Sequence, residues 1–427
     1  MRLLTAIVVL VAAMLLAGPG WMRARKVEPR APRTPNTVQG NSRGYVTTPQ
    51  ELAVVAHKAA SNLSPYKEAV ARVLAEAGAP GEWPYGSLDG EQSCASTQEP
   101  AYLARGSPRI LAQAMAYHLT GKREYAAAVR ERLLDLTDTF GYGGEKYGGA
   151  NHCILNLAWY LPGFIQAADL IEDFPGWTSG DKRALQHWLA REVYKKVDDA
   201  SDKRSNNWGS AGSATAAMIA DYAAGSGELL LDRDGHQWSP QAAYEKAKQR
   251  QLDRVSGNRY MDNYNCHQPV GIRADGGIPE ELARGTTGCD GLWIRERDAS
   301  WTYTQTYLQG TILHAELLLR RGDRSLYENL AADGRGSLLR AIHFLSQNPN
   351  TPGKSVGWSE RDKPSLEVAY RYYRDAASAT ELRVGRPDRF IGHRSHQMLH
   401  FGTVTHGFAP GENPSPPPTV PPPGETP

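Results

Sequence analysis

The sequence has almost no net charge, few cysteines and little phenylalanine. Its 427 residues include 48 Lys and Arg against 46 Asp and Glu, which leaves a formal charge of only +2. A chain without a strong positive field has no general attraction for nucleic acid, so an acidic polymer must be bound by local basic groups. The four cysteines have a spacing that fits no zinc-binding pattern, and we predict no metal and no cofactor.

The aromatic residues are instead mainly Trp and Tyr, with 10 and 20 against 7 Phe. The flat apolar body and polar edge of these side chains suit stacking on sugar rings, and they equally suit helix packing with the polar edge at the surface. Strand signals are weak, and the length suits one large domain or two small ones.

The N-terminus is typical of an export signal. Arg2 precedes an apolar run that ends at Gly18-Pro19-Gly20. A run of about 15 residues suits a signal peptide better than a full membrane span of about 20. We predict a signal peptide or N-terminal anchor over 1–22, and a secreted or periplasmic protein that contacts the membrane only if this segment stays uncleaved. A Pro- and Arg-rich disordered linker over 23–46 and a Pro-rich disordered tail over 409–427 are also expected.

An even number of cysteines in an exported chain is consistent with two disulfides, in three possible connectivities. Cys266 and Cys289 are close in sequence, which favours a bridge between them. That pairing leaves Cys94 to bond with Cys153.

Apolar positions at helical spacing predict a nearly all-helical chain. Thr48 and Pro49 supply a cap and a first-turn proline for the first helix. Short connections between successive helices favour antiparallel pairs. We therefore predict an all-α fold over 47–408, an incomplete (α/α) toroid of antiparallel helical hairpins, with a plain helical bundle as the alternative. The expected helices lie near 49–62, from 64 onward, and near 107–120, 124–139, 152–173, 180–200, 207–224, 240–255, 301–321, 323–333, 335–347 and 364–382.

The stretch Ser205–Gly212 pairs two amides with an indole at the predicted start of a long helix. An Asn at this position is normally a helix cap, but Asn206 and Asn207 together exceed the need for one cap. Amide donors, the preceding Lys203 and Arg204, and the positive helix end would together favour a bound carboxylate. The small residues that follow Trp208 allow close approach to a neighbouring helix, or simply tight packing.

Two further stretches carry candidate groups. In 274–285, Asp275-Gly276 is a turn signal and Pro279 can begin a short helix with Glu280, Glu281 and Arg284. The plain alternative is an exposed turn with a Glu280–Arg284 pair. In 301–316, one helix face carries Tyr303, Tyr307, Gly310 and His314, a stripe that also fits core packing.

In this order, the stretches resemble the alginate lyase superfamily of helical-toroid polysaccharide lyases. The resemblance spans about residues 50–345, and the ordered set carries it rather than any single motif. The matching pieces are Ala116-Tyr-His-Leu-Thr-Gly-Lys-Arg-Glu-Tyr125-Ala, Asn206-Asn207-Trp208, Asp275-Gly276 with Glu281-Leu-Ala-Arg284, and Tyr303 followed by Ala315-Glu316.

The resemblance implies β-elimination at a uronic acid, with an acidic polysaccharide as the partner and a monomeric enzyme. Carried over by position, Asn207 binds the uronate carboxylate, Tyr303 is the catalytic tyrosine and Arg284 lies beside it. A neighbouring guanidinium favours the phenolate form that a base requires. The remaining predicted substrate-binding residues are Asn206, Trp208, Lys146, Tyr147, His267 and Tyr307.

The sequence departs from this family at two places. Trp208 occupies the position at which the most closely studied alginate lyases usually have His, so the usual imidazole base is absent there. Either Tyr303 serves as both base and acid, which suits a syn elimination, or His152 or His267 substitutes. The second departure is an insertion, 287–300, expected to form a disulfide-pinned flap.

Two other function classes remain open from the sequence. A glycoside hydrolase on the same architecture needs two carboxylates about 5–9.5 Å apart, for which Asp275 and Glu281 are the clustered candidates. A non-catalytic protein that binds acidic polysaccharide would instead have lost catalysis with the Trp208 departure.

Overall fold

The computed structural model describes the helices and most of the segments that join them. The described residues all belong to the unit Asn36–Pro427. At the helix starts 99–102, 150–152 and 298–300, only the backbone is described. The described ranges are 42–79, 99–139, 150–258, 260–261, 268–269, 271–282, 298–347, 358–392, 394–395 and 397–407.

Nearly all regular structure in these ranges is helical. The two sheets found there are short antiparallel hairpins, β1 (Leu230–Leu231) with β2 (Gln237–Trp238) and β3 (Tyr260–Met261) with β4 (Gln268–Pro269). The helices are α2 (Pro49–Ala60), α3 (Tyr66–Ala77), α4 (Glu99–Thr120), α5 (Arg123–Thr139), α6 (Ala150–Leu170), α7 (Ser179–Trp188), the π-helical turn η1 (Leu189–Val193), α8 (Tyr194–Lys203), α9 (Asn207–Ala223), α10 (Pro240–Ser256), α11 (Pro279–Leu282), α12 (Asp298–Arg320), α13 (Leu338–Gln347), α14 (Lys363–Tyr373), α15 (Ala376–Glu381) and α16 (Gly402–His406).

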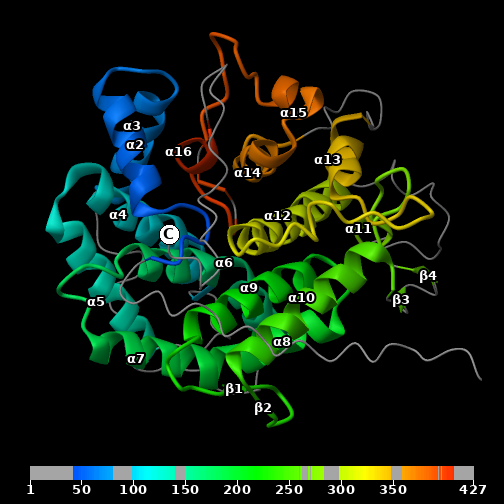
Figure 1. Cartoon of the computed structure of the whole chain (residues 1–427), viewed down its shortest axis with the longest axis horizontal. Helices are drawn as coiled ribbons and strands as arrows, with labels where there is room; N and C mark the ends of the chain where they lie inside the picture. The colour runs from blue at the N-terminus through cyan, green and yellow to red at the C-terminus, as the bar shows by residue number, and fades with distance from the viewer. Residues whose placement is uncertain are drawn as a thin grey trace, which may run out of the picture. The chain divides into compact units, whose positions relative to one another are not determined.

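Helices α6 and α9 pack side by side (Figure 1). Part-way along both helices, the Thr215 hydroxyl donates to the carbonyl of Ala158 at 2.8 Å. At their C-terminal ends Arg43 joins them, because its backbone N–H donates to Asp169 and its guanidinium donates to the carbonyl of Ala224. Since matching ends lie together, the two helices are parallel.

Helix α12 is parallel to α9 by the same test. The Ser210 hydroxyl donates to the carbonyl of Tyr307 at 2.7 Å, toward the N-terminal end of α9. At the other end, Arg321 donates two hydrogen bonds to Asp221, at 3.0 and 2.8 Å. The paired residues keep a nearly constant offset along the contact. The N-terminal ends of α6, α9 and α12 therefore lie at one end of the domain.

Helix α14 joins this parallel set on the other side of α12. Gln309 donates to Asp362, the residue before α14, at 2.7 Å. At the far ends of the two helices, Arg320 and Arg371 both donate to Glu51, at 3.1 and 3.0 Å. Matching ends again lie together.

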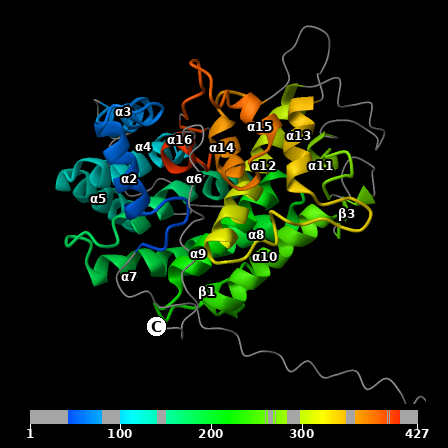
Figure 2. The same ribbon diagram turned by 45° about the horizontal axis from the view of Figure 1, so that its top comes forward.

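The chain returns between the parallel helices through antiparallel ones. Along α7, η1 and α8, Gln186 donates to the carbonyl of Tyr222 at 3.0 Å, and the Ser201 and Ser213 hydroxyls lie 2.7 Å apart. Residue numbers rise along α7, η1 and α8 while the numbers of their partners on α9 fall, so these segments run antiparallel to α9. Figure 2 shows α8, α9, α10 and α12 packed together. The predicted antiparallel hairpins are present.

Local sequence explains how the helices begin. Thr48 accepts from the backbone N–H of Glu51, whose carboxylate accepts from the Thr48 N–H in return, so α2 starts at Pro49 as predicted. Helix α9 contains mostly small residues, nearly all of them buried. A helix with so little side-chain bulk can approach its neighbours closely.

Glycines mark the points of closest approach. A Cβ added at Gly310 would lie 2.6 Å from Ser210 Oγ and 2.7 Å from Ala211 N, and one at Gly212 would lie 2.8 Å from Ser201 N. These neighbours are mainly backbone atoms of another helix, which cannot move aside individually. The small residues predicted to allow close packing do so.

We expect Gly310→Ala to lower the free energy of unfolding by about 1–3 kcal/mol, because overpacking a tight interface costs that much. Gly180→Ala is the matched control, since its added Cβ meets only Thr178 Oγ1 at an ordinary 3.6 Å. Urea unfolding followed by circular dichroism measures both variants. An equal stability for Gly310→Ala and the parent would contradict the close α9–α12 packing.

The structure differs from the helix predictions at several places. Helix α4 begins at Glu99 and not near residue 107, and α16 was not predicted. Residues 323–333 form turns, because Gly322 has a positive φ of 80° and Asp323 accepts from the Ser325 N–H. The predicted helix 180–200 contains the π-helical turn η1. The predicted helix 364–382 is broken at Arg374, whose φ is 53°.

The end of the predicted linker 23–46 is packed on the domain. The Ser42 hydroxyl and the Gly44 N–H donate to Asp169 at 2.7 and 2.8 Å, and Tyr45 and Val46 are buried. Ordered packing thus begins before residue 47. Residues 1–41 and 408–427, which hold the predicted signal and tail, lie outside the described residues. No helix in the described part of the chain is long and apolar enough to cross a membrane.

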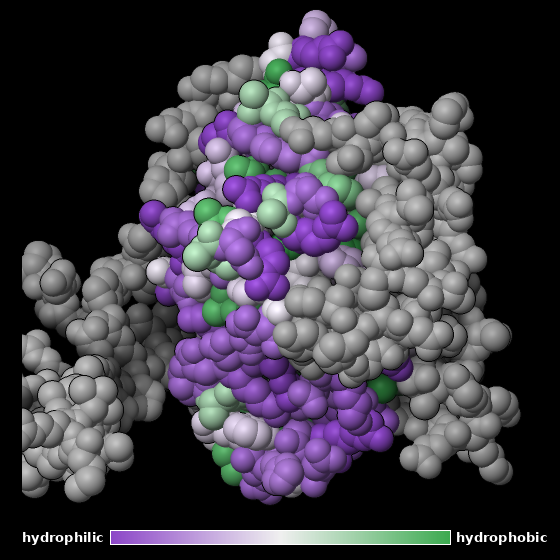
Figure 3. Space-filling view, turned by 90° about the vertical axis from the view of Figure 1, so that its right-hand side faces the viewer, coloured by the Kyte–Doolittle hydropathy of each residue, from purple (hydrophilic) through white to green (hydrophobic). Residues whose placement is uncertain are grey.

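Among the residues coloured by hydropathy in Figure 3, hydrophobic side chains form small patches between hydrophilic ones. The exposed large hydrophobic residues of the described ranges are scattered along the sequence: Val54, Leu63, Leu229 and Leu330.

Candidate functional site

The N-terminus of α9 carries the two consecutive amides. Asn206 is the N-cap, and its side-chain oxygen accepts from the Trp208 N–H at 3.0 Å. Asn207 is the first helical residue and is fully buried. The Asn206 amide therefore caps the helix, as Asn usually does, and the Asn207 amide takes no part in capping.

Asn207 is held by a carboxylate from a distant part of the chain. Glu281 in α11 accepts from both the backbone N–H and the side-chain Nδ2 of Asn207, the latter at 3.2 Å. Both residues are fully buried. The Oδ1 atom of Asn207 is buried and has no hydrogen-bond partner in the described part of the structure. Glu281 thereby fixes which way the amide faces.

The loop that presents these amides is fastened by Arg254 of α10. Its guanidinium donates to the carbonyls of Ser201 and Arg204, at 2.6 and 3.2 Å, and to Gln251 Oε1 at 2.7 Å. Arg254 is fully buried, and it is not among the site residues predicted from the sequence. Its spacing could have revealed it, because Ala243, Ala247, Gln251 and Arg254 share the buried face of α10.

Trp208 lies half-buried beside this loop. The Arg204 guanidinium lies over its indole, 5.0 Å from the ring centroid, in a cation–π contact. The basic residue and the indole predicted to flank a bound sugar are thus neighbours in space.

Tyr303 stands beyond the end of α9. The Gly310 position on α12 lies against Ser210 and Ala211 of α9, and Tyr303 is seven residues before Gly310. Asn207 is three residues before Ser210, so the rise of 1.5 Å per residue puts Tyr303 about 6 Å further along the axis than Asn207. The half-buried Tyr303 therefore lies just beyond the N-terminal end of α9, which carries the two amides.

The other residues of the α12 stripe belong to the core. Tyr307, predicted to bind substrate, is fully buried, and burial raises the pKa of its hydroxyl. His314 is also fully buried, and burial lowers its pKa to about 3, so its ring is neutral. Of the residues in this stripe, only Tyr303 is partly exposed, and the others are buried in the core. Tyr307 packs in the core and does not present itself to a ligand.

His152 belongs to the first turn of α6, at the same end of the domain as Asn207 because the two helices are parallel. Its side chain is outside the described part. Cys153, the next residue, is buried, while the other three cysteines lie outside the described residues, so both disulfide pairings stay predictions. The predicted site residues that fall outside the described ranges are Arg284, His267, Lys146 and Tyr147.

The carboxylates proposed for a hydrolase do not form a matched pair. Asp275 is half-exposed, is bonded to Arg273 at 2.6 Å and accepts from the Gly277 N–H in the predicted turn. Glu281 is fully buried and bonded to Asn207. Glu280 is also buried, so the predicted exposed turn is wrong at this position.

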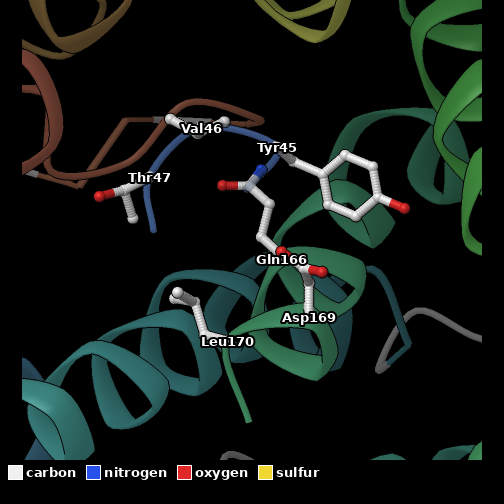
Figure 4. Close-up of a pocket in the computed structure, with 6 residues that line it drawn as sticks. All are labelled: Tyr45, Val46, Thr47, Gln166, Asp169 and Leu170. Carbon is white, nitrogen blue, oxygen red and sulfur yellow. The ribbon is translucent and has the colours of Figure 1, made fainter. Parts of the chain in front are cut away.

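A crevice elsewhere has no part in this arrangement. Figure 4 shows it between residues 45–47 and α6, with Gln166, Asp169 and Leu170 on the helix side. Asp169 is joined through Arg43 to Ala224, next to the C-terminal end of α9. The crevice therefore lies at the opposite end of α9 from Asn207.

Part of the chain matches a known protein family. The alginate lyase family model matches residues 53–230. Over these residues the chain is similar to alginate lyases, as predicted from the sequence, and the match supports a polysaccharide lyase. The predicted (α/α) toroid is confirmed by the fold of the solved structures. No curated protein matches the chain in sequence.

The solved structures that resemble this lyase do so in fold across most of their length. An alginate lyase from Bacteroides ovatus has a TM-score of 0.56 and 16% identity, and the match covers 80% of this chain and 94% of that one. Alginate lyase A1-III from a Sphingomonas species has a TM-score of 0.53 and 13% identity, over 85% and 95% of the two chains. A histidine-to-alanine variant of alginate lyase A1-III, complexed with a tetrasaccharide, has a TM-score of 0.56 at 14% identity, over 87% and 96%.

Proposed function

We propose that this lyase cleaves a uronic-acid-containing polysaccharide, of the alginate, polymannuronate or glucuronan type, by β-elimination. One observation carries the proposal. Tyr303, the tyrosine expected to be catalytic, lies just beyond the helix end at which Glu281 holds the Asn207 amide. The names of the solved relatives support the same reading, since they are alginate lyases and one holds a tetrasaccharide.

The first requirement is to neutralise the uronate carboxylate. The C5 proton is too weakly acidic to be removed while the carboxylate keeps its full charge, so donors must stabilise the developing enolate. Asn207 Nδ2 gives one hydrogen to Glu281, which leaves its second hydrogen for a uronate oxygen. Its buried Oδ1 can accept from a sugar hydroxyl. Arg284 would add positive charge on the carboxylate.

The second requirement is proton transfer. The Tyr303 phenolate takes the C5 proton, the released electron pair forms the C4–C5 double bond, and the C4–O4 bond breaks. The phenol then returns the proton to O4, so one residue serves as base and acid on one face of the sugar. This route suits a chain with Trp208 in place of the usual histidine. His152 or His267 as a separate base is the alternative, and His152 begins the helix next to α9.

Incubation with alginate, polymannuronate, glucuronan and hyaluronan tests the proposal. We expect absorbance from unsaturated uronate to appear with at least one polymer and without added cofactor. Products that lack the double bond would indicate hydrolysis. Binding with neither new reducing ends nor the double bond would indicate a non-catalytic binding protein.

We also propose that the enzyme is exported and acts as a monomer outside the cell or in the periplasm. The support is the apolar run after Arg2, ahead of the Pro-rich segment. Sequencing the N-terminus of the protein recovered from cell fractions distinguishes a cleaved signal peptide from a membrane anchor.

A further inference from the structure

Arg361 projects from a turn that is rigidly attached to α12. The Ser359 N–H, two residues before Arg361, donates to Gln305 Oε1 at 2.9 Å. Asp362, directly after Arg361, is fully buried and accepts from Gln309 at 2.7 Å. The chain is thus held on both sides of Arg361, which limits where its guanidinium can lie.

This turn lies at the same end of the domain as Asn207. Gln305 and Gln309 span the level of Tyr307, whose carbonyl accepts from Ser210 near the start of α9. The turn contacts α12 on the face opposite to the one that meets α9. Neighbouring helices lie about 8–10 Å apart, so Arg361 is about two helix spacings from Asn207.

The Arg361 guanidinium keeps donors for a ligand. Its side chain is 39% exposed, and one terminal nitrogen lies 3.3 Å from the Asp362 carboxylate. Its Nε is buried and has no hydrogen-bond partner in the described structure. Five N–H donors in a planar fork suit bidentate binding of a carboxylate, and the Asp362 contact uses only part of that capacity.

We propose that Arg361 forms a second carboxylate site that binds a uronate several residues from the cleaved bond. The inference rests on the proposed function, because a uronate polymer carries a carboxylate on every such residue. The site at Asn207 acts on the reacting sugar, whereas Arg361 holds the chain.

Kinetics on purified oligouronides of increasing length test this site. For the parent enzyme we expect KM to fall once the chain is long enough to reach Arg361. In Arg361→Gln that fall disappears, so KM for long chains rises about 10-fold, the usual scale for a lost charge-assisted hydrogen bond, while kcat is unchanged. Arg361→Lys, which keeps the charge without the fork, should show a smaller rise.

Arg386→Gln is the matched control, because it removes the same charge from a side chain that is 61% exposed and paired with Asp388. It should leave KM unchanged at every length. An unchanged KM in Arg361→Gln, or a rise that is equal for short and long chains, would overturn the second site. If the parent enzyme cleaves no uronate polymer, the proposed function fails, and calorimetric binding of long acidic chains to both variants still decides the role of Arg361.

Discussion

Tyr303→Phe is expected to lower kcat by about 10²–10⁴-fold, the range that general acid–base catalysis contributes. The change removes one hydroxyl from a half-buried side chain and leaves the ring in place. Binding of the polymer should therefore persist, since the Asn207 amide and the Arg361 guanidinium are untouched. Steady-state kinetics give the loss of turnover, and calorimetry gives the dissociation constant.

Tyr307→Phe is the control for this result, because it makes the same change one helical turn further along α12. Tyr307 is fully buried in the helix core, and the proposed mechanism gives its hydroxyl no part in proton transfer. We expect the control to keep its kcat. If Tyr303→Phe retained activity, the assignment of the acid would be wrong, and a histidine such as His152 would have to supply the proton.

Asn207→Ala is expected to lower kcat by about 10²–10³-fold, the usual loss when one donor to a developing oxyanion is removed. The helix cap is provided by Asn206, so α9 should still begin at the same residue. Circular dichroism and the unfolding midpoint verify that the fold is kept. An Asn207→Ala enzyme with full activity would mean that the uronate carboxylate is bound elsewhere.

Glu281→Gln tests how Asn207 is oriented. The glutamine amide can present a donor where Glu281 now accepts from Asn207 Nδ2, which would turn the Asn207 amide over. We expect a loss of kcat that is no larger than that of Asn207→Ala. If Glu281 acts through Asn207, the double variant should lose no more than Asn207→Ala alone, since coupled residues are not additive. Additive losses would give Glu281 an independent role.

These expectations depend on electrostatics at a buried helix end. The first residues of α9 present backbone N–H groups and the positive end of the helix dipole, which favour negative charge. Glu281 already occupies one side of that end. A uronate carboxylate brings a second negative charge, so nearby cations are required. Arg254 of α10 donates to carbonyls of the segment that leads into α9, and Arg284 follows Glu281 by three residues in the sequence.

Local chemistry explains the helix starts that the sequence predicted. Thr48, Pro49 and Glu51 act within a few residues of one another, so their capping arrangement can be recognised without the fold. The same holds for the Asp275–Gly276 turn, where Asp275 accepts from the Gly277 N–H. The helix predicted over 323–333 is wrong, because glycine and aspartate turns interrupt an otherwise helical spacing.

Side-chain partners across the fold could not be predicted in the same manner. Glu281 and Asn207 are 74 residues apart, and their pairing depends on how α11 packs against α9. Tyr303 and Tyr307 have the same type and the same helix face. Only the position of the α9 end decides that one is fully buried and the other is not.

The sequence by itself determined that the chain is helical, that its helices form antiparallel hairpins, and that two amides begin α9. Those features follow from periodicity, caps and small residues, which act over a few residues at a time. Only the tertiary structure decided that α6, α9, α12 and α14 run parallel with their N-terminal ends together. That arrangement brings four residues to one end of the domain: Asn207, Glu281, Tyr303 and Arg361. The sequence could not decide it, because it depends on contacts between segments far apart in the chain.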